Sequence, residues 1–162
     1  MKMSLLQIEK LQITFPHRLG DFTAVNDFSM QVERGEIVGL IGESGAGKST
    51  VGNAIMGLLQ KPGIVTQGSI RLDGEDLGQL DRSSMARLRG RRIGMIFQDP
   101  MTSLNPLVKV GDQLSESIAI LQGLSARKAQ QLACERLADV GIPEPAERMR
   151  QYPHEFSGGM RQ

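Results

Sequence analysis

One stretch decides the fold, Gly42-Glu43-Ser44-Gly45-Ala46-Gly47-Lys48-Ser49, and it matches the pattern G-x-x-x-x-G-K followed by Ser or Thr. An apolar pentad at residues 37–41 precedes it, and apolar side chains at helical spacing follow over residues 49–59. A short run that is apolar on both faces predicts a buried parallel strand. A strand, a glycine-rich loop and a helix in this order predict a phosphate-binding loop.

The residue types in this loop suit phosphate chemistry. Gly45 and Gly47 let the backbone curl, so that consecutive N–H groups converge on phosphate oxygens. The start of the following helix adds partial positive charge, and Lys48 adds a full charge. The hydroxyl of Ser49 is placed to bind Mg²⁺, and Thr50 completes the predicted site without a separate role. The loop alone leaves kinases, GTPases, helicases and transporters open.

Length and composition set limits on the rest. The chain has 162 residues, of which 40% are hydrophobic and 23% charged, so roughly one domain with a subdomain is expected. The net charge of +1 gives no field that would favour nucleic acid as a partner. The single cysteine, Cys134, excludes an intramolecular disulfide. The N-terminus resembles neither a signal peptide nor an anchor, so we expect a soluble chain with only peripheral membrane contact.

The remaining pattern divides the chain at residue 98. Short apolar alternations over residues 5–32 predict strands and turns. Further elements are expected at residues 69–72 (a strand), 81–89 (a short polar helix) and 93–97 (a second buried strand). Residues 1–98 are therefore predicted as a β part with the phosphate-loop core.

Residues 99–162 are predicted to be a helical subdomain. Apolar side chains share helical faces in two segments: Leu114, Ile118 and Leu121 in the first, and Ala129, Leu132, Ala133 and Leu137 in the second. Gly123 and Gly141 stand where helix C-terminal caps belong. Pro143 and Pro145 prevent the second helix from continuing.

The chain ends in a second glycine motif, Phe156-Ser157-Gly158-Gly159-Met160-Arg161-Gln162. Ser157 is a good N-cap, and Gly158 and Gly159 expose backbone amides at the start of a helix, which makes a second anion site. This motif resembles the LSGGQ-type signature of ABC ATPases, with Phe for Leu and Met for Gln. Residues 98–106 and 152–160 are similar to one branch of that family, the ATP-binding subunits of dipeptide, oligopeptide, nickel and glutathione importers.

The resemblance covers nearly the whole chain, from about Leu5 to Gln162. It implies an α/β fold with the P-loop NTPase core of an ABC ATPase, incomplete here, an N-terminal antiparallel β part and an α-helical subdomain. It implies that the phosphate loop binds ATP and Mg²⁺. A kinase or GTPase fits poorly, because the motif over residues 156–160 has no place in it.

The resemblance also assigns roles outside the loop. Gln98 falls where the family carries its Q-loop glutamine, which reaches the Mg²⁺ and the attacking water, so Gln98 is the catalytic candidate and, with Ser49, a metal candidate. Residues 156–160 would close over ATP held by the opposite subunit. An aromatic residue stacks on adenine in the family. Phe15 fits that role best and Phe22 second, and either could equally be a core residue.

The resemblance implies the partners of a transport ATPase. They are the membrane-spanning permease subunits, a second ABC ATPase subunit in a head-to-tail dimer, and indirectly a solute-binding protein. The helical subdomain would receive a coupling helix of the permease. The implied function is an ATP-binding subunit of an importer of peptides or related small solutes, at the cytoplasmic face of the membrane.

The sequence departs from the family at its end. Members continue into a strand that ends in Asp-Glu and then into a switch histidine, and neither His17 nor His154 fits that role. We therefore expect no appreciable ATP hydrolysis by this chain alone, and apolar edges left uncovered beside the phosphate-loop strand. The alternatives are a non-catalytic nucleotide-binding or interaction module and a non-functional gene fragment.

One dense basic run remains. It consists of Arg82, Arg87, Arg89, Arg91 and Arg92. Contact with phosphate or with an acidic partner surface is open, but we favour a solvated helix face and strand entry.

Overall fold

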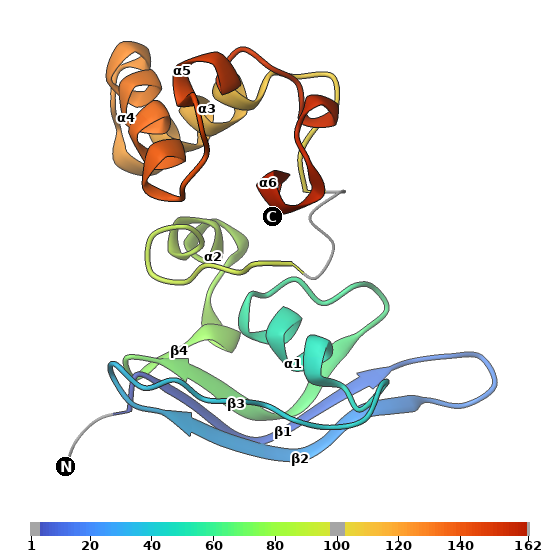
Figure 1. The fold of residues 1–162 in the computed structure, drawn as a ribbon. Coiled ribbons are helices and arrows are strands. Elements are labelled where there is room, and N and C mark those ends of the chain that lie inside the picture. Colours follow the sequence, from blue (N-terminus) through green and yellow to red (C-terminus); the bar gives the residue numbers. More distant parts are fainter. Residues whose placement is uncertain (1–3, 98–102, 162) are drawn as a thin grey trace. The chain divides into compact units, whose positions relative to one another are not determined.

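The computed structural model describes residues 4–97 and 103–161 (Figure 1). The chain folds into two compact units, Met1–Gly94 and Met95–Gln162. Each unit has a buried cluster of apolar side chains of its own. The boundary that the sequence places after Gln98 falls at residues outside the described ranges.

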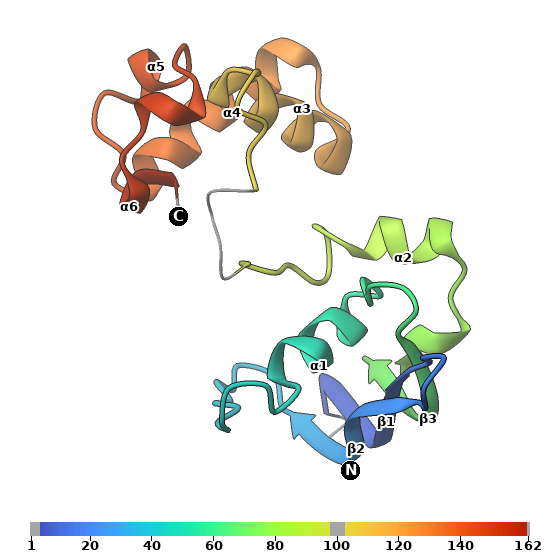
Figure 2. The same cartoon turned by 90° about the vertical axis from the view of Figure 1, so that its right-hand side faces the viewer.

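The first unit is built on a four-stranded antiparallel sheet with the strand order β2-β1-β3-β4. The strands are β1 (Leu6–Phe15), β2 (Phe22–Val32), β3 (Ile64–Leu72) and β4 (Glu75–Asp76). Helix α1 (Lys48–Ile55) covers one face of this sheet (Figures 1 and 2). The structure thus confirms the strands expected over residues 5–32 and extends the strand expected at residues 69–72 toward the N-terminus.

The core of the first unit lies between this sheet and its helices. Ile8, Leu11 and Ile13 of β1 are fully buried. Val51 and Ala54 of α1 belong to the same cluster of buried side chains. The apolar residues of α1 face this core, and the start of the helix, where the glycine-rich loop ends, lies against β2.

Two expected strands are absent from the structure. Residues 37–41 form no strand, and Ile37 and Ile41 are 98% and 95% exposed. Residues 93–97 make a single parallel bridge, between Arg89 and Ile93, and Ile96 is 84% exposed. An apolar run becomes a buried strand only where neighbouring strands take up its N–H and C=O groups. Among the described residues no strand pairs with residues 37–41, so this prediction was wrong.

Helix α2 (Arg82–Leu88) follows the short 3-10 helix η1 (Leu77–Gln79), and it confirms the polar helix expected at residues 81–89. Asp81 caps α2, because its Oδ1 accepts a hydrogen bond of 2.8 Å from the N–H of Ser84. The hydroxyl of Ser83 donates to the same carboxylate. These hydrogen bonds lower the pKa of Asp81 below its ordinary value of 3.8, Ser84 contributing most.

This cap predicts how the stability of the first unit depends on pH. The folded-state pKa of Asp81 is depressed, so its contribution is fully present above the unfolded-state pKa and is lost as the pH falls from about 4 through the folded pKa. Asp81→Asn keeps an acceptor but no charge, and we expect its Tm to lie below that of the wild type at pH 7. The two Tm values should approach each other as the pH falls from about 4 through the folded pKa of Asp81. A constant difference across a pH series of thermal melts would contradict this assignment.

The second unit is helical, as expected. It contains α3 (Val110–Gln122), α4 (Ala126–Asp139), α5 (Pro145–Arg148), the 3-10 helix η3 (Pro153–Glu155) and α6 (Gly158–Arg161). Gly123 is the left-handed C-cap of α3, and Gly141 follows α4 with φ of 77°. Ala133, Leu137 and Met149 form its buried cluster, against which Leu114 and Ile118 pack. Within residues 4–97 and 103–161, no helix has the length and apolar character needed to cross a membrane.

Candidate phosphate-binding site

The glycine-rich loop runs directly into α1. Gly45 and Gly47 both have φ of 84°, in the left-handed region that favours glycine, and Gly47 is the N-cap of the helix. The N–H of Ala46 donates to the carbonyl of Glu43 at 3.2 Å, which closes a tight turn within the loop. The N–H of Val51 donates to the carbonyl of Gly47 at 2.9 Å and begins the helical hydrogen bonds.

Gly47 also lies against the backbone of β2. A Cβ atom at this position would stand 2.6 Å from the carbonyl oxygen of Ala24 and 3.0 Å from Cγ2 of Val25. Only a residue without a side chain permits so close an approach. The end of the loop is therefore held directly on the sheet.

Lys48 folds back over the loop. Its Nζ donates to the carbonyl of Gly42 at 2.8 Å and to that of Glu43 at 2.6 Å. Within the described part of the chain Lys48 forms no ion pair. An ammonium group has three donors, so one is left for a ligand, and its charge is not neutralised by a carboxylate.

Backbone donors accompany this charge. In the described residues, the N–H groups of Gly47, Lys48 and Ser49 donate to no protein acceptor, as is usual in the first turn of a helix. The side chain of Ser49 is exposed in the same turn. One loop therefore offers free amides, a hydroxyl and an ammonium group that forms no ion pair among the described residues. These groups fit the phosphates of a nucleotide and the Mg²⁺ that accompanies them.

The second glycine motif lies in the second unit. Ser157 caps α6, and its Oγ accepts from the N–H of Met160 at 3.4 Å, which is the geometry expected for an N-cap. Arg161 closes the same turn, because its Nε donates to the carbonyl of Phe156 at 3.0 Å. Phe156 is buried, and so is Pro153 before it. The motif is thus an ordered turn that presents Gly158 and Gly159 at the start of a helix.

A family model described as ABC transporter matches residues 25–162. The chain belongs to the ABC transporter family. The matched range includes both glycine motifs, the phosphate loop and the segment at residues 156–160.

Sequence comparison with individual proteins supports the same family. The chain is 45% identical over 160 residues to the dipeptide transport ATP-binding protein of Escherichia coli, with 99% of this chain and 49% of that protein covered. It is 45% identical over 159 residues to the oligopeptide transport ATP-binding protein of Bacillus subtilis, covering 98% and 44%. The oligopeptide transport ATP-binding protein of Salmonella typhimurium is 46% identical over 158 residues, covering 98% and 47%. The chain spans about half the length of these relatives.

Solved structures show the fold. A bacterial ABC transporter cassette solved as a dimer has a TM-score of 0.82 at 23% identity, covering 96% of this chain and 65% of that chain. An ATP-binding cassette solved in a dimeric post-hydrolysis state with ADP and phosphate has a TM-score of 0.79 at 23% identity, with the same coverage. This confirms the α/β fold of an ABC ATPase, with its antiparallel β part and helical subdomain.

The resemblance also assigned roles to Gln98 and to an aromatic residue, Phe15 or Phe22. Gln98 lies outside the described residues. Phe15 stands at the end of β1 opposite Phe22 of β2. Its ring packs over Gly63, where a Cβ would stand 2.6 Å from Cε1 of Phe15, and it contacts the core cluster. Phe22 is 64% exposed. Phe15 therefore has a packing role, and the residue that stacks on adenine stays a prediction.

Two arginines of the basic run have partners that are distant in the chain. Arg89 donates from Nε to the carbonyl of Met56 at 2.7 Å and from Nη2 to that of Gly57 at 3.0 Å. Arg92 pairs with Asp73 at 3.0 Å and with Glu75 at 2.8 Å, and these carboxylates raise its pKa, Asp73 contributing most. For Arg89, which is half-buried, the prediction of a solvated face was wrong, whereas Arg92 is exposed and also forms ion pairs. No local sequence signal could reveal partners so distant in the chain.

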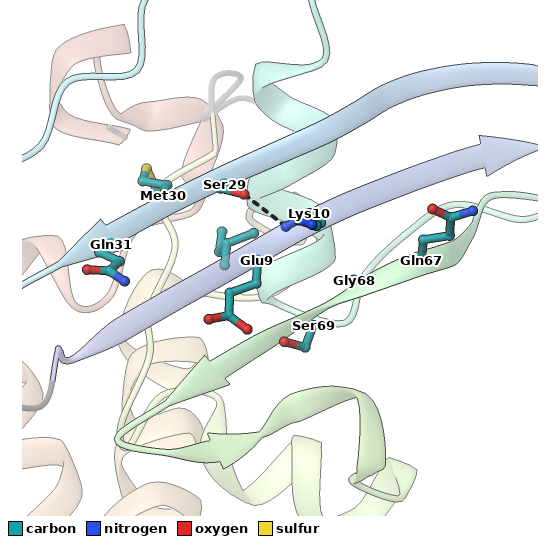
Figure 3. Close-up of a pocket in the computed structure, with 9 residues that line it drawn as sticks. Glu9, Lys10, Ser29, Met30, Gln31, Gln67, Gly68 and Ser69 are labelled. Carbon is teal, nitrogen blue, oxygen red and sulfur yellow. Dashed lines mark hydrogen bonds between the residues drawn. The ribbon is translucent and has the colours of Figure 1, made fainter.

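A groove of about 930 Å³ lies away from the phosphate loop, on β1, β2 and β3 (Figure 3). The groove lies at a β-bulge, and Lys10 and Gly68 line it. These two residues have φ of 46° and 84°, and the register of β1 with β3 shifts between Glu9 and Gln12. The N–H of Lys10 donates to Oγ of Ser29 at 2.9 Å. No residue of the phosphate loop lines this groove, so it is not part of the candidate site.

Proposed function

We propose that this chain is the nucleotide-binding part of an ATP-binding subunit of an ABC importer for peptides or related small solutes. The observation that carries the proposal is the ammonium of Lys48, which donates to the carbonyls of Gly42 and Glu43 and meets no carboxylate among the described residues. The choice of solute is supported by the names of the relatives, which are dipeptide and oligopeptide transport ATP-binding proteins.

The residues have separate tasks in this proposal. Lys48 and the amides of Gly47 and Ser49 bind the terminal phosphates of ATP. The hydroxyl of Ser49, with Gln98, holds Mg²⁺, which neutralises phosphate charge when bound. Because Lys48 is already fixed by two carbonyl oxygens, little side-chain entropy is lost when a phosphate binds.

The assembly is part of the same proposal. The motif at residues 156–160 closes over ATP on the opposite subunit of a head-to-tail dimer. Permease subunits bind the helical subdomain at the cytoplasmic face of the membrane, and a solute-binding protein delivers the solute. The ordered N-cap of Ser157 supports the first point, because it presents the amides of Gly158 and Gly159 to an anion.

Binding of Mg-ATP to the purified chain tests the nucleotide site. A ligand that binds the folded state at 100 times its Kd stabilises it by about 2.7 kcal/mol, so the Tm should rise by several degrees. Lys48→Ala removes a charged hydrogen-bond donor worth about 1.5–3 kcal/mol, so the Kd from calorimetry should rise by about 10- to 100-fold.

The matched control is Lys128→Ala, which removes an exposed lysine from α4 in the other unit. It should bind Mg-ATP as the wild type does. Equal Kd values for the wild type and Lys48→Ala would contradict the proposed site. The expected lack of ATP hydrolysis by the chain alone stays a prediction, and release of phosphate from Mg-ATP measures it separately.

A further inference from the structure

Helix α1 carries the proposed phosphate site on a short element. It has eight residues, which is a length of about 12 Å, and helices this short are not stable by themselves in water. Val51 and Ala54 are its buried residues. The positions of its first-turn amides and of Lys48 therefore depend on what holds the two ends of the helix.

The first end is held by Gly47, which lies on the backbone of β2. The other end is held by Arg89. The guanidinium of Arg89 donates to the carbonyls of Met56 and Gly57 at 2.7 and 3.0 Å, directly after α1 ends at Ile55. These are carbonyls that the helix itself leaves without partners.

Arg89 is itself well placed for this role. It is the C-cap residue of α2, and its N–H donates to the carbonyl of Met85 at 3.1 Å. Met85 and Leu88 are buried in the same core as α1. A Cβ at Gly57 would stand 3.1 Å from Cε of Met85, so α2 and the end of α1 are in close contact. The packing of α2 thus fixes where the guanidinium lies.

The charge of Arg89 acts in the same direction as its hydrogen bonds. The last turn of α1 contains no basic residue, so its negative end is not neutralised from within the helix. A cation at the C-terminus of a helix stabilises the helix dipole. The same dipole presents its positive end to phosphates at Gly47 and Lys48. Removing the guanidinium frees the C-terminal end of α1 and weakens both effects.

We propose that Arg89 is a positioning residue for the nucleotide: by fixing the C-terminal end of α1, it holds the first-turn amides and Lys48 in the geometry that binds phosphate. This inference rests on the proposed function. It goes beyond that function because Arg89 stands at the far end of the helix from the phosphates.

The test compares Mg-ATP affinity with stability in three variants of the full chain. Arg89→Gln removes the charge and the paired donors, and Arg89→Lys keeps the charge. Arg91→Gln removes the charge of an exposed neighbour that, among the described residues, forms no hydrogen bond or ion pair with α1. Each Kd is measured by calorimetry well below the Tm of that variant. Circular dichroism at the same temperature confirms that the variant is folded.

For Arg89→Gln we expect the Kd of Mg-ATP to rise by about three- to tenfold, which matches the range for a charge at a helix terminus. Arg89→Lys should recover part of this loss, and Arg91→Gln should bind as the wild type does. Hydrogen exchange at the amides of α1 should become faster in Arg89→Gln and not in Arg91→Gln.

Each outcome decides between the claims. A lower Tm for Arg89→Gln with the Kd of the wild type would show that Arg89 only stabilises the fold, and would overturn the inference alone. Absence of Mg-ATP binding by the wild type would contradict the proposed function and remove the inference with it. If Arg89→Gln does not fold, Arg89→Lys decides: an unchanged Kd for this variant overturns the inference.

Discussion

Gly47→Ala should lower the stability of the first unit and remove its response to Mg-ATP. The new Cβ would stand 2.6 Å from the carbonyl oxygen of Ala24, and the φ of 84° is unfavourable for any residue with a side chain. The left-handed backbone costs about 1–2 kcal/mol and the overpacking about 1–3 kcal/mol, so we expect a loss of about 2–5 kcal/mol. Thermal melts should show the Tm reduced by roughly 10 °C or more.

A neighbouring glycine separates the two causes. Gly45 has the same φ of 84°, but a Cβ there would meet no atom within 4 Å. Gly45→Ala should therefore lose only the backbone contribution, about 1–2 kcal/mol. Equal losses of stability in Gly45→Ala and Gly47→Ala would mean that the approach of the loop to β2 is unimportant.

The nucleotide response of Gly47→Ala should fall even where the variant is folded. Relief of the clash with Ala24 moves the start of α1 away from β2, and with it the amides that we propose bind the phosphates. The Tm increase that Mg-ATP gives to the wild type should then be absent from Gly47→Ala. A full increase in this variant would contradict the assignment of these amides to the phosphate site.

Gly68→Ala should strongly destabilise the sheet. A Cβ at Gly68 would stand 2.5 Å from the carbonyl oxygen of Lys10 and 2.6 Å from its carbonyl carbon, and φ is 84°. These atoms belong to the backbone of β1, a central strand of the sheet, so they cannot move without breaking its pairing with β3. Strain and overpacking together predict a loss of about 2–5 kcal/mol.

Gly74 is the matched control for this prediction. It has φ of 81°, and a Cβ there would meet nothing within 4 Å. Gly74→Ala should cost about 1–2 kcal/mol, which is the backbone contribution alone. Urea denaturation of both variants measures the difference. Equal midpoints for Gly68→Ala and Gly74→Ala would show that β1 and β3 adapt to the added side chain.

The bulge at Gly68 was not predicted from the sequence. The pattern of residues 69–72 indicates a strand, and the structure confirms it as the end of β3. That this strand lies beside β1, with a shift of register near Lys10, depends on residues far away in the chain. A bulge becomes visible only when both strands are present.

The two strands expected at residues 37–41 and 93–97 show the opposite case. Their apolar patterns are clear, yet Ile37, Ile41 and Ile96 are exposed. An apolar sequence indicates that a segment can be buried between layers of secondary structure. Whether it is buried depends on neighbouring strands, and none of the described residues supplies one for residues 37–41.

The sequence by itself determined the conformation of the glycine-rich loop at residues 42–49. Its requirements are local: two glycines that allow positive φ, consecutive free amides, and a lysine that reaches back six residues to the carbonyl of Gly42. All of these features lie within eight adjacent residues, so a sequence motif is enough to identify them. The same holds for the N-cap at Ser157 and for the helix-ending glycines of the second unit.

Only the tertiary structure decided what holds this loop in place. Arg89 reads in the sequence as one member of a basic run, but it donates to Met56 and Gly57, which are 33 and 32 residues away. Gly47 has the φ of any turn glycine, and its close approach to Ala24 exists only in the folded sheet. The acceptors are backbone carbonyls, which every residue carries, so no residue type marks them in advance. Packing of α1 and α2 on the sheet selects which carbonyl a side chain meets.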